Sequence, residues 1–549
     1  MKTIERPYAL AAARLRRSAV STATKWTSTY RKSKDGPWGF DRHPWTVEMT
    51  DCEEDWCGMK AAQMGFTEVC LNRALFTIDI KRLNVLYIMP SKTPDATDFS
   101  ADRFDGALEL SPHLEQMFSD VKNIGHKRAG SVSLYLRGAR SRSGLKSIPA
   151  ALIVYDEFAE MASNMVTLAE ERSSGQTYSQ DIRISTPLLP KDNIDNEYTN
   201  SSLELFSYNC PHCSQWQILD HDNCFKLCGD GVNDPDIRKS HYFCPNCKTP
   251  IPHERKKDYF RHDNTEWVRG KSSYMKRGFR IPQHYSFDLE PWKLARLTFK
   301  AQYDVMAEAE LWNSKYGLPK ETAGARLTGE EYEFCKDLTH STDAYPADYD
   351  FIVMGIDVGR QYHIEVWAVK ATADWTGDIE DFAASCNVTV INAFTVDDTN
   401  DVLSALDKYR PLAYCIDANP ETRAAKRITA HRPGQGYRVQ YATDRTVAVA
   451  SHREDMIFAG RSYWLDSLRN RFKKPKTRYR LPIDIRHDHK DHFQSLVKHY
   501  SRNKKGDYEA QYLTQGADHF NHAANYAGIA IRATLFSEFG QNVPTKNPF

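Results

Sequence analysis

The chain has 549 residues, of which 41% are hydrophobic and 12% aromatic. At roughly 100–200 residues per domain, this length predicts two to four domains, each with a core of its own. No stretch approaches the roughly 18 apolar residues that cross a bilayer, and the basic start of the chain lacks an apolar run with a cleavage site, so we expect neither a membrane protein nor a secretory signal.

The formal net charge is only +1, and the twelve cysteines are scattered except for two close pairs. This cysteine usage suits a reducing cytoplasm rather than a disulfide framework. The near-neutral total conceals basic clusters within residues 1–35 and 469–480, the second interleaved with Phe472 and Tyr479. Each cluster is consistent with binding to nucleic-acid phosphates and equally with a solvated basic face.

Residues 1–50 read as a basic segment that is helical at first and then irregular. From about residue 55 to 190, apolar strand candidates alternate with helical stretches, which is typical of a mostly parallel α/β sheet. The strand candidates are residues 85–89, 151–155 and 182–185. We therefore expect an α/β domain over residues 51–335.

Within that domain, residues 205–250 form a segment of different composition, rich in cysteine, asparagine and histidine. Helical periodicity returns around residues 291–316. Residues 336–350 are polar and contain Pro346, so we expect a linker there. A new apolar strand, 351–356, then opens a second α/β domain that we place at residues 351–549.

A phosphate loop is indicated between the first strand and helix of the first domain. The usual loop reads G-x-x-x-x-G-K-[ST], and its amides, lysine and hydroxyl hold phosphates and Mg²⁺. Here Gly65 and Thr67 keep the closing glycine and the hydroxyl, Phe66 occupies the lysine position, and Lys60 stands where the first glycine would be. A plain helix start is the alternative interpretation of this relaxed pattern.

The strand at 151–155 ends in two adjacent carboxylates, Asp156 and Glu157. Two neighbouring anions repel each other, so a purely structural strand rarely ends this way. We expect Asp156 to lie beside a phosphate-bound Mg²⁺ and Glu157 to polarise the attacking water. The next strand ends in Ser185 and Thr186, which are placed to sense the γ-phosphate or simply to end a strand.

Two C-x-x-C pairs predict a structural zinc site within the segment 205–250. Two residues between thiolates allow both to bind one tetrahedral Zn²⁺, and two such pairs complete the site. The predicted ligands are Cys210, Cys213, Cys244 and Cys247. Four protein ligands leave no open position, so we do not expect catalysis by this metal.

The second α/β domain carries three separated carboxylates. Asp357 and Asp417 each follow an apolar strand, and Asp518 lies near the start of a long helix. Together they form the layout of an RNase H-like nuclease, in which such acids hold two divalent ions about 3.5–4 Å apart. The predicted catalytic metal ligands are therefore Asp357, Asp417 and Asp518, for Mg²⁺ or Mn²⁺.

Other polar residues near these acids allow two interpretations. Glu365 follows Asp357 on the next strand, where alternation places it on one face with His363 and Trp367. It is either an auxiliary metal ligand or an exposed strand residue. The histidine-rich tract 486–492 is interpreted as a solvated loop rather than a metal site.

Four segments follow in order: K-A-A-Q-M-G-F-T-E at 60–68, S-G-L-K-S-I-P-A at 143–150, I-V-Y-D-E-F-A-E at 153–160 and R-I-S-T-P at 183–187. Together they resemble the large terminase subunits of tailed phages, in the lambda-like branch, whose phosphate loop has its lysine at the front. The run 309–319 resembles the segment that closes the ATPase half in this family, with Tyr316 in place of a leucine.

The resemblance implies that Lys60 is the phosphate-binding lysine and that Glu157 activates water. Nucleotide-binding residues would then be Lys60, Gly65, Phe66, Thr67, Asp156, Ser185 and Thr186. An arginine finger from a neighbouring subunit is expected in such ring motors; the sequence does not identify it, and Arg140 and Arg142 are candidates.

The last helix resembles the family pattern D-D-x-x-D-A-x-x-Y-A. Asp518 matches its first acid, whereas His519 and His522 stand in place of the other two. Asp518 is therefore the one acid carried over, with His522 as a candidate ligand.

The fold implied is an N-terminal P-loop ASCE-type ATPase with a zinc-ribbon insertion, joined to a C-terminal RNase H-like nuclease. The function implied is ATP-driven translocation of double-stranded DNA into a procapsid, with cutting of concatemeric DNA by a two-metal endonuclease. ATP, Mg²⁺ or Mn²⁺ and Zn²⁺ are the expected cofactors. The expected partners are double-stranded DNA, a small terminase subunit, the capsid portal and further copies in a ring, in the host bacterial cytoplasm and without a membrane.

Two other functions explain part of the sequence. A helicase or remodelling ATPase accounts for the first site but not for the acids at 357, 417 and 518. An RNase H-like transposase or integrase accounts for those acids but makes the first domain a scaffold. A zinc-stabilised DNA scaffold without activity leaves both sets of acids unexplained.

Overall fold

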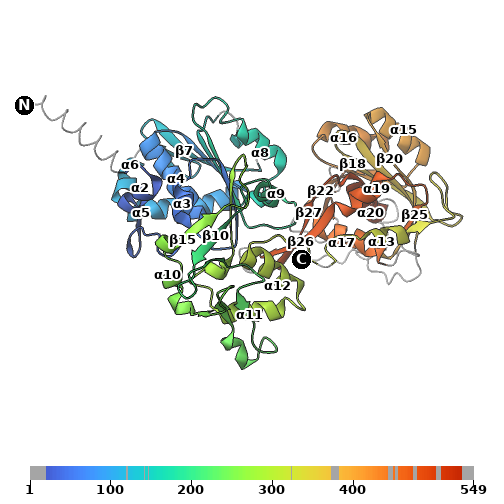
Figure 1. The fold of residues 1–549 in the computed structure, drawn as a ribbon. Coiled ribbons are helices and arrows are strands. Elements are labelled where there is room, and N and C mark those ends of the chain that lie inside the picture. Colours follow the sequence, from blue (N-terminus) through green and yellow to red (C-terminus); the bar gives the residue numbers. More distant parts are fainter. Residues whose placement is uncertain are drawn as a thin grey trace, which may run out of the picture. The chain divides into compact units, whose positions relative to one another are not determined.

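The chain forms two compact units, residues 1–322 and 323–549 (Figure 1). The computed structural model describes residues 20–118, 121–140, 142–145, 148–322, 324–371, 382–442, 449–451, 455–473, 479–502 and 508–534. In these ranges no helix combines the length and the hydropathy that spanning a lipid bilayer requires.

The first unit is organised around a large, mostly parallel sheet. Its strand order is β11-β10-β16-β3-β9-β8-β4-β7-β6-β5, and all neighbours from β10 to β7 are parallel. The strands are β3 (Trp56–Lys60), β4 (Val85–Met89), β5 (Val121–Asn123), β6 (His126–Ala129), β7 (Val132–Gly138), β8 (Leu152–Asp156), β9 (Gln180–Ser185), β10 (Glu204–Asn209), β11 (Trp216–Ile218) and β16 (Arg277–Ile281), with β15 (Thr265–Val268) on β10. The α/β sheet expected from the sequence is confirmed.

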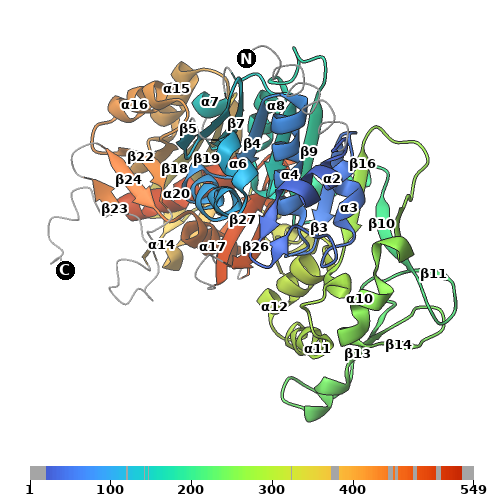
Figure 2. The same cartoon turned by 90° about the vertical axis from the view of Figure 1, so that its left-hand side faces the viewer.

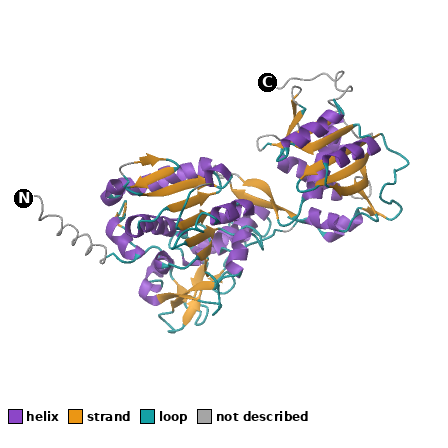
Figure 3. Ribbon diagram, turned by 90° about the horizontal axis from the view of Figure 1, so that it is seen from above, coloured by secondary structure: helices purple, strands orange, loops and turns teal. Residues whose placement is uncertain are grey.

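Helices cover both faces of this sheet (Figures 1 and 3). One core cluster joins alternate strand residues to α2 (Ala23–Tyr30) and α4 (Phe66–Phe76), and the other joins the remaining ones to α8 (Ser163–Glu170) and α9 (Asn193–Thr199). Strands buried on both faces read as continuous apolar runs, which is why they are visible in the sequence. Further helices are α3 (Thr46–Asp51), α5 (Gly106–Leu110), α6 (Pro112–Met117), α7 (Arg142–Leu145), α11 (Pro291–Lys300) and α12 (Val305–Ala309).

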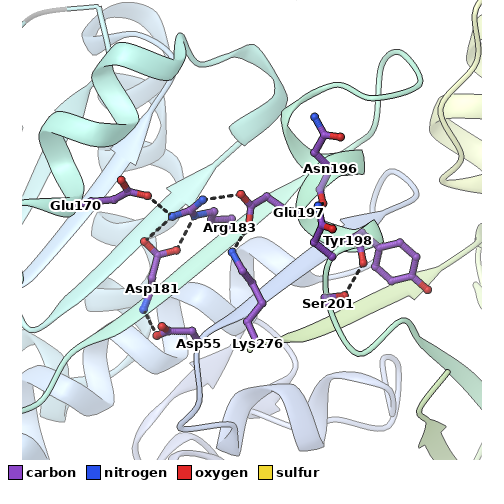
Figure 4. Close-up of polar contacts among 10 residues, drawn as sticks. Asp55, Glu170, Asp181, Arg183, Asn196, Glu197, Tyr198, Ser201 and Lys276 are labelled. Atoms are coloured by element: carbon purple, nitrogen blue, oxygen red, sulfur yellow. Dashed lines mark hydrogen bonds and ion pairs between the residues drawn. The ribbon is translucent and has the colours of Figure 1, made fainter. Parts of the chain in front are cut away.

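An ion-pair cluster ties β9 to the helices beside it (Figure 4). The guanidinium of Arg183 donates to Asp181 at 2.7 Å, to Glu170 of α8 at 2.6 Å and to Glu197 of α9 at 2.7 Å. Lys276, just before β16, also pairs with Glu197. The Arg183 side chain is mostly buried, so these carboxylates offset the cost of burying its charge.

The cysteine-rich segment forms a small antiparallel sheet of its own, seen at the lower right of Figure 2. It consists of β12 (Phe225–Lys226), β13 (His241–Phe243) and β14 (Pro250–Ile251), followed by α10 (Lys256–Tyr259). Such short strands bury little apolar surface by themselves, but Tyr242 and Ile251 of this sheet pack into the main core cluster of the first unit.

The second unit contains a mixed sheet with the order β17-β25-β20-β19-β18-β21-β22-β24-β23. Strands β18, β19 and β20 form an antiparallel meander, whereas β21, β22 and β24 run parallel to β18. The strands are β17 (Lys336–Asp337), β18 (Phe351–Val358), β19 (Tyr362–Lys370), β20 (Asn387–Val396), β21 (Ala413–Asp417), β22 (Gly436–Tyr441), β23 (Val449–Ser451), β24 (Met456–Ala459) and β25 (Tyr479–Pro482).

One face of this sheet packs against α15 (Thr399–Tyr409) and α16 (Thr422–His431), and the other against α17 (Arg461–Phe472) and α20 (His519–Ala533). The other elements described here are α13 (Gly329–Phe334), α14 (Phe382–Ser385), α19 (Asp488–Gln494) and the hairpin β26 (Leu496–Arg502) and β27 (Tyr508–Thr514).

The tract 486–492 is not the solvated loop that its composition suggested. Its residues from Asp488 onward form α19, and the side chains of His489 and His492 are buried. Their burial depends on distant partners in this unit, which the local sequence does not reveal.

A close approach between α20 and β18 fixes the helix on the sheet. A Cβ atom added to Gly355 would lie 1.9 Å from the carbonyl oxygen of Ala523 and 2.3 Å from the amide nitrogen of Ala527. Only glycine leaves room for the helix backbone at this point of β18.

We therefore expect Gly355→Ala to destabilise the second unit by about 1–3 kcal/mol or more, because the helix must move away from the sheet. Gly528→Ala, at the same helix–sheet interface, is the matched control: the added Cβ would meet only Trp367, at 3.9 Å. It should be neutral, or stabilising by up to about 1 kcal/mol through helix propensity. Calorimetric unfolding of the full chain measures both, and equal stabilities would contradict the close-packing account.

Candidate functional sites

The loop after β3 is held by backbone contacts on both sides. The amide of Ala61 donates to Ile281 at 3.1 Å, and that of Ala62 donates to Ser314 at 2.9 Å. Gly65 closes the loop with φ +81°, a left-handed conformation that favours glycine, and α4 begins at the next residue. The segment 309–319, noted for its sequence pattern, thus supports the phosphate-loop candidate through its backbone.

Gln283 is a support of this loop that the sequence reasoning missed, and Gly317, within the run 309–319 noted in the sequence, supports the loop as well. The side-chain amide of Gln283 donates to the carbonyl of Ala62 at 2.5 Å. Gly317 has φ +62°, and a Cβ there would lie 2.8 Å from the amide nitrogen of Ala61. A buried amide beside a strand end carries no specific signal when the strand order is unknown.

Lys60 and the paired carboxylates meet at the carboxyl ends of β3 and β8. The Lys60 ammonium lies 3.1 Å from Glu157. Asp156 is buried and accepts hydrogen bonds from the Tyr87 hydroxyl at 2.7 Å and from the Thr67 hydroxyl at 3.4 Å. The structure therefore brings together Lys60, Thr67, Asp156 and Glu157, as the sequence pattern predicts for a site that binds a phosphate and a divalent cation.

The electrostatics of this site follow from burial. Burial, together with the charge of Glu157, raises the pKa of Asp156 to about 6, although Lys60 opposes the shift. Burial tends to lower the pKa of Lys60, but the charges of Glu157 and Asp156 outweigh it and raise that pKa. Glu157 itself adopts φ +59°, a conformation that is uncommon for a non-glycine residue and concentrated at functional sites.

Ser185 joins this group from the end of β9. Its hydroxyl lies 3.3 Å from the Glu157 carboxylate and accepts a hydrogen bond from the amide of Ala159 at 3.2 Å. Thr186 contributes its carbonyl oxygen to the Ser185 hydroxyl. Ser185, rather than Thr186, is thus the residue of this strand end that contacts the carboxylate.

Phe66, which occupies the usual lysine position, points into the core. Its side chain is buried, and its ring would be 2.7 Å from a Cβ at Gly58. The cation of the site therefore comes from Lys60 on β3. Of the two arginine-finger candidates, Arg140 is exposed. Burial raises the pKa of nearby Glu160, and the charge of Arg140 opposes this shift. The side chain of Arg142 lies outside the described residues.

The four cysteines of the C-x-x-C pairs converge. The sulfur atoms of Cys210 and Cys247 lie 3.9 Å apart, as do those of Cys213 and Cys244, and all four lie within 4.8 Å of one another. Tetrahedral Zn²⁺ with Zn–S bonds of about 2.3 Å separates its sulfurs by roughly 3.8 Å. Cys224 lies outside this group, and its thiol donates to the carbonyl of Asp220.

The acids of the second unit come from adjacent strands and one helix. Ile356 pairs with Ile416 between parallel strands, so Asp357 and Asp417 follow at neighbouring strand ends. Asp357 is buried, and Asp417 is half-buried. Burial and the charge of Asp357 raise the pKa of Asp417.

Asp518 takes part in a separate set of contacts. It accepts a hydrogen bond from the Thr514 hydroxyl at 2.8 Å and lies 3.2 Å from Nε2 of His522. Although burial opposes the shift, His522 lowers the pKa of Asp518 to about 2. In the described residues, the metal-competent group at Asp357 contains His363 and His519, and Asp417 and Asp518 lie outside it.

Glu365 is fully buried, unlike the exposed strand residue considered above. Its carboxylate accepts from the Trp367 indole at 2.6 Å and from the Tyr479 hydroxyl at 3.2 Å, and it lies 2.7 Å from Nε2 of His489. The Tyr332 hydroxyl contacts the other ring nitrogen of His489 at 2.6 Å. Both oxygens of this carboxylate are thus engaged inside the core, Oε2 by Trp367 and Tyr479 and Oε1 by His489, which favours a structural role.

The described arginines of the second basic cluster contact other groups of the protein. Arg469 donates to the carbonyls of Gly324 and Ala325, and Arg471 to those of Ala383 and Cys386. Arg480 pairs with Asp337. Arg469 and Arg471 therefore form neither a solvated face nor a phosphate-binding patch, whereas Lys473 is exposed. The basic residues at 474, 476 and 478, and those before residue 20, lie outside the described residues.

The comparisons with known proteins point in one direction. Residues 32–267 match the family model described as phage terminase large subunit gpA, ATPase domain. No curated protein matches the chain.

Three solved structures illustrate the structural likeness. The large terminase of bacteriophage HK97 is 10% identical, with 92% of this chain and 98% of that chain covered and a TM-score of 0.47. The large terminase of a thermophilic bacteriophage in complex with ADP is 10% identical, with 89% and 96% covered and a TM-score of 0.28. The large terminase nuclease of the thermophilic phage G20c with bound magnesium is 14% identical, with 39% and 90% covered and a TM-score of 0.23.

The Glu365 network predicts a strong effect on stability. We expect Glu365→Ala to lower the free energy of unfolding by about 3–5 kcal/mol, because it leaves His489, Tyr479 and Trp367 buried without their partner. Glu330→Ala, at an exposed position of α13, should change it by less than about 0.5 kcal/mol. Full stability combined with weaker metal binding in Glu365→Ala would instead identify Glu365 as an auxiliary ligand.

Proposed function

We propose that the whole chain is the motor subunit of a viral DNA-packaging machine, because residues 32–267 match the family model of phage terminase large-subunit ATPase domains. ATP hydrolysis in the first unit drives translocation of double-stranded DNA, and the second unit cuts concatemeric DNA. The observation that carries the proposal is the meeting of Lys60, Asp156 and Glu157 inside the matched segment, with a separate unit bearing acids at strand ends.

The strand order of the first unit supports an ASCE-type ATPase. Strand β9 lies between β3, which carries Lys60, and β8, which carries Asp156 and Glu157. In this arrangement Lys60 binds the phosphates of ATP, and Glu157 accepts a hydrogen bond from the attacking water and orients it. Mg²⁺, for which Thr67 and Asp156 are the fitting oxygen ligands, neutralises phosphate charge when bound.

The position of Ser185 supports a route from hydrolysis to movement. Its hydroxyl contacts Glu157, and two residues earlier Arg183 is clamped to α8 and α9 (Figure 4). A change in the hydrogen bonds of Glu157 therefore acts on β9, whose Arg183 is hydrogen-bonded to α8 and α9. We propose this strand as the coupling element.

The strand order of the second unit supports an RNase H-like nuclease. An antiparallel meander is followed by parallel strands beside its first strand, in the order β20-β19-β18-β21-β22. Asp357 and Asp417 end adjacent strands of that order, and Asp518 precedes the helix that packs over them. Carboxylates at these positions would hold divalent ions, which would supply stabilisation of the attacking and leaving oxygens of a phosphodiester.

The cysteine group supports a zinc-ribbon insertion with a structural role. Its geometry fits Zn²⁺, which would join the two C-x-x-C pairs at one tetrahedral centre.

The partners belong to the same proposal. We propose a homo-oligomeric ring at the capsid portal, acting with a small terminase subunit on double-stranded DNA in the host cytoplasm, and with an arginine finger supplied by a neighbouring copy. The family match of the ATPase segment supports these partners.

The two activities should separate by substitution in the full chain. Glu157→Gln should lower ATP turnover at least about 100-fold and leave metal-dependent DNA cleavage intact, whereas Asp357→Asn should do the reverse. ATP turnover and cleavage of linear double-stranded DNA are measured side by side for each variant. Loss of both activities in either variant, or of neither, would contradict the assignment of two separate sites.

The zinc proposal predicts one zinc ion per chain by elemental analysis. Cys213→Ser should lose it and unfold at lower temperature, because a thiolate ligand is removed. Cys228→Ser is the matched control, since Cys228 lies between the two pairs but outside the sulfur group. Zinc-free wild-type protein, or equal zinc loss in both variants, would exclude this site.

A further inference from the structure

Two histidines lie beside the first acid of the second unit. Asp357 on β18 pairs directly with His363 on the antiparallel neighbour β19. His519, the first residue of α20, places Nδ1 2.9 Å from the Asp357 carboxylate. One ligand atom from each of the three residues lies within 4.8 Å of the other two. Two strands and a helix thus deliver two imidazoles and one carboxylate to one point.

Within the described ranges, the buried imidazole of His363 has a ring nitrogen without a hydrogen-bond partner. Its relative exposure is only 9%, and among the described residues its Nδ1 atom has no hydrogen-bond partner. A buried ring nitrogen without a partner costs free energy, and it persists where an ion or another unseen group completes it. Its ring stacks on that of His519 with centroids 4.5 Å apart.

The start of α20 is itself fixed by a third histidine. Nδ1 of His492 accepts a hydrogen bond from the amide of Phe520 at 3.2 Å. The guanidinium of Arg486 lies over the Phe520 ring at 4.8 Å. These contacts fix the position of Phe520 and thereby orient the neighbouring His519. The groups that make them, His492 and Arg486, are not among the three residues that converge at Asp357.

Ligand type decides which ion such a site prefers. Carboxylate and water ligands suit Mg²⁺, whereas imidazole suits Zn²⁺, Fe²⁺, Co²⁺ and Ni²⁺. Among the described residues no lysine or arginine lies within salt-bridge distance of Asp357, so a cation at this point would also neutralise a buried carboxylate.

We propose that Asp357, His363 and His519 form a divalent-metal site of mixed imidazole and carboxylate ligands, which selects a first-row transition-metal ion over Mg²⁺ for the nuclease centre. The inference rests on the proposed nuclease function for its role, but the site itself is defined by these three residues alone. His519 is a specificity-determining ligand, since an acid at this position would make the site richer in oxygen.

The test is a titration of the full-length protein with Co²⁺, in which binding is measured by calorimetry and by visible absorption. Weak bands without thiolate charge transfer mark a nitrogen and oxygen site, so any Co²⁺ at the cysteine group is recognised separately. His363→Asn and His519→Asn should each weaken Co²⁺ binding at this site about 10- to 100-fold. His431→Asn, which removes a histidine of α16 that pairs with Asp407, should leave it unchanged.

His519→Asp tests the selectivity. The ratio of Co²⁺ to Mg²⁺ affinity should fall about tenfold or more, because an imidazole is exchanged for a carboxylate. The His519 side chain is 40% exposed at the start of α20, so substitutions there should not prevent folding. If His363→Asn fails to fold, His519→Asn and His519→Asp still test the metal site. Unchanged Co²⁺ affinity in the His519 variants, or an unchanged ratio in His519→Asp, would overturn the proposal.

DNA cleavage measured in parallel separates this inference from the proposed function. If Co²⁺ binds as expected but no metal supports cleavage, the metal site stands and the nuclease proposal fails. If Mg²⁺ supports cleavage while the histidine variants bind Co²⁺ like the wild type, the nuclease proposal stands and the mixed-ligand site fails.

Discussion

The contact between Lys60 and Glu157, beside the buried Asp156, is the interaction on which the first unit depends. Two adjacent carboxylates at a strand end repel each other, and one of them lies almost entirely out of water. The ammonium group of Lys60, at the end of β3 on the same edge of the sheet, offsets the electrostatic cost of placing these two charges together. Because the strands are parallel, their carboxyl ends meet at one edge, which is where ligands bind in open α/β sheets.

Under the proposed function, this contact also sets how a nucleotide enters the site, because the phosphates of ATP would compete with Glu157 for the Lys60 ammonium. Once Lys60 turned to the phosphates, the Glu157 carboxylate would be free to accept a hydrogen bond from water. Lys60 would then serve both to stabilise the paired carboxylates and to bind the substrate. Ser185, already in contact with Glu157, is positioned to respond to the exchange.

The second unit reaches its site by a different constraint. Gly355 permits the backbone of α20 to lie directly on β18, and this contact carries His519 to Asp357 two residues farther along the strand. Glu365 and His489 contact Trp367, Tyr479 and Tyr332, which belong to the core cluster on the side of the sheet that α20 covers. Their buried pair holds α19 against the sheet, and α19 in turn fixes the start of α20 through His492.

The sequence was informative where function and burial coincide. Strand 85–89 was predicted with its observed bounds, and the strand beginning at 351 with its observed start, because buried strands are continuous apolar runs. The family resemblance implied that Lys60 and Glu157 serve one site, and the structure places them 3.1 Å apart. The tract 486–492 was misjudged, because its burial depends on Glu365, more than a hundred positions earlier in the chain.

Strand register was a further limit. Asp357 faces His363 because of the tight connection between β18 and β19, and sequence patterns do not fix that register. The charge-rich composition around residues 469–480 likewise concealed arginines that donate to backbone carbonyls inside the unit. Composition reports how many charges a segment has, and tertiary structure decides which of them reach solvent.

The most direct test of the central claim is the affinity of Glu157→Gln for a non-hydrolysable ATP analogue, measured by equilibrium titration. If Glu157 competes with phosphates for Lys60, removal of its charge should tighten binding by about 3- to 10-fold, the equivalent of roughly 1 kcal/mol for a partly exposed ion pair. Unchanged or weaker binding in Glu157→Gln would show that Lys60 is not held by Glu157 and would contradict the account.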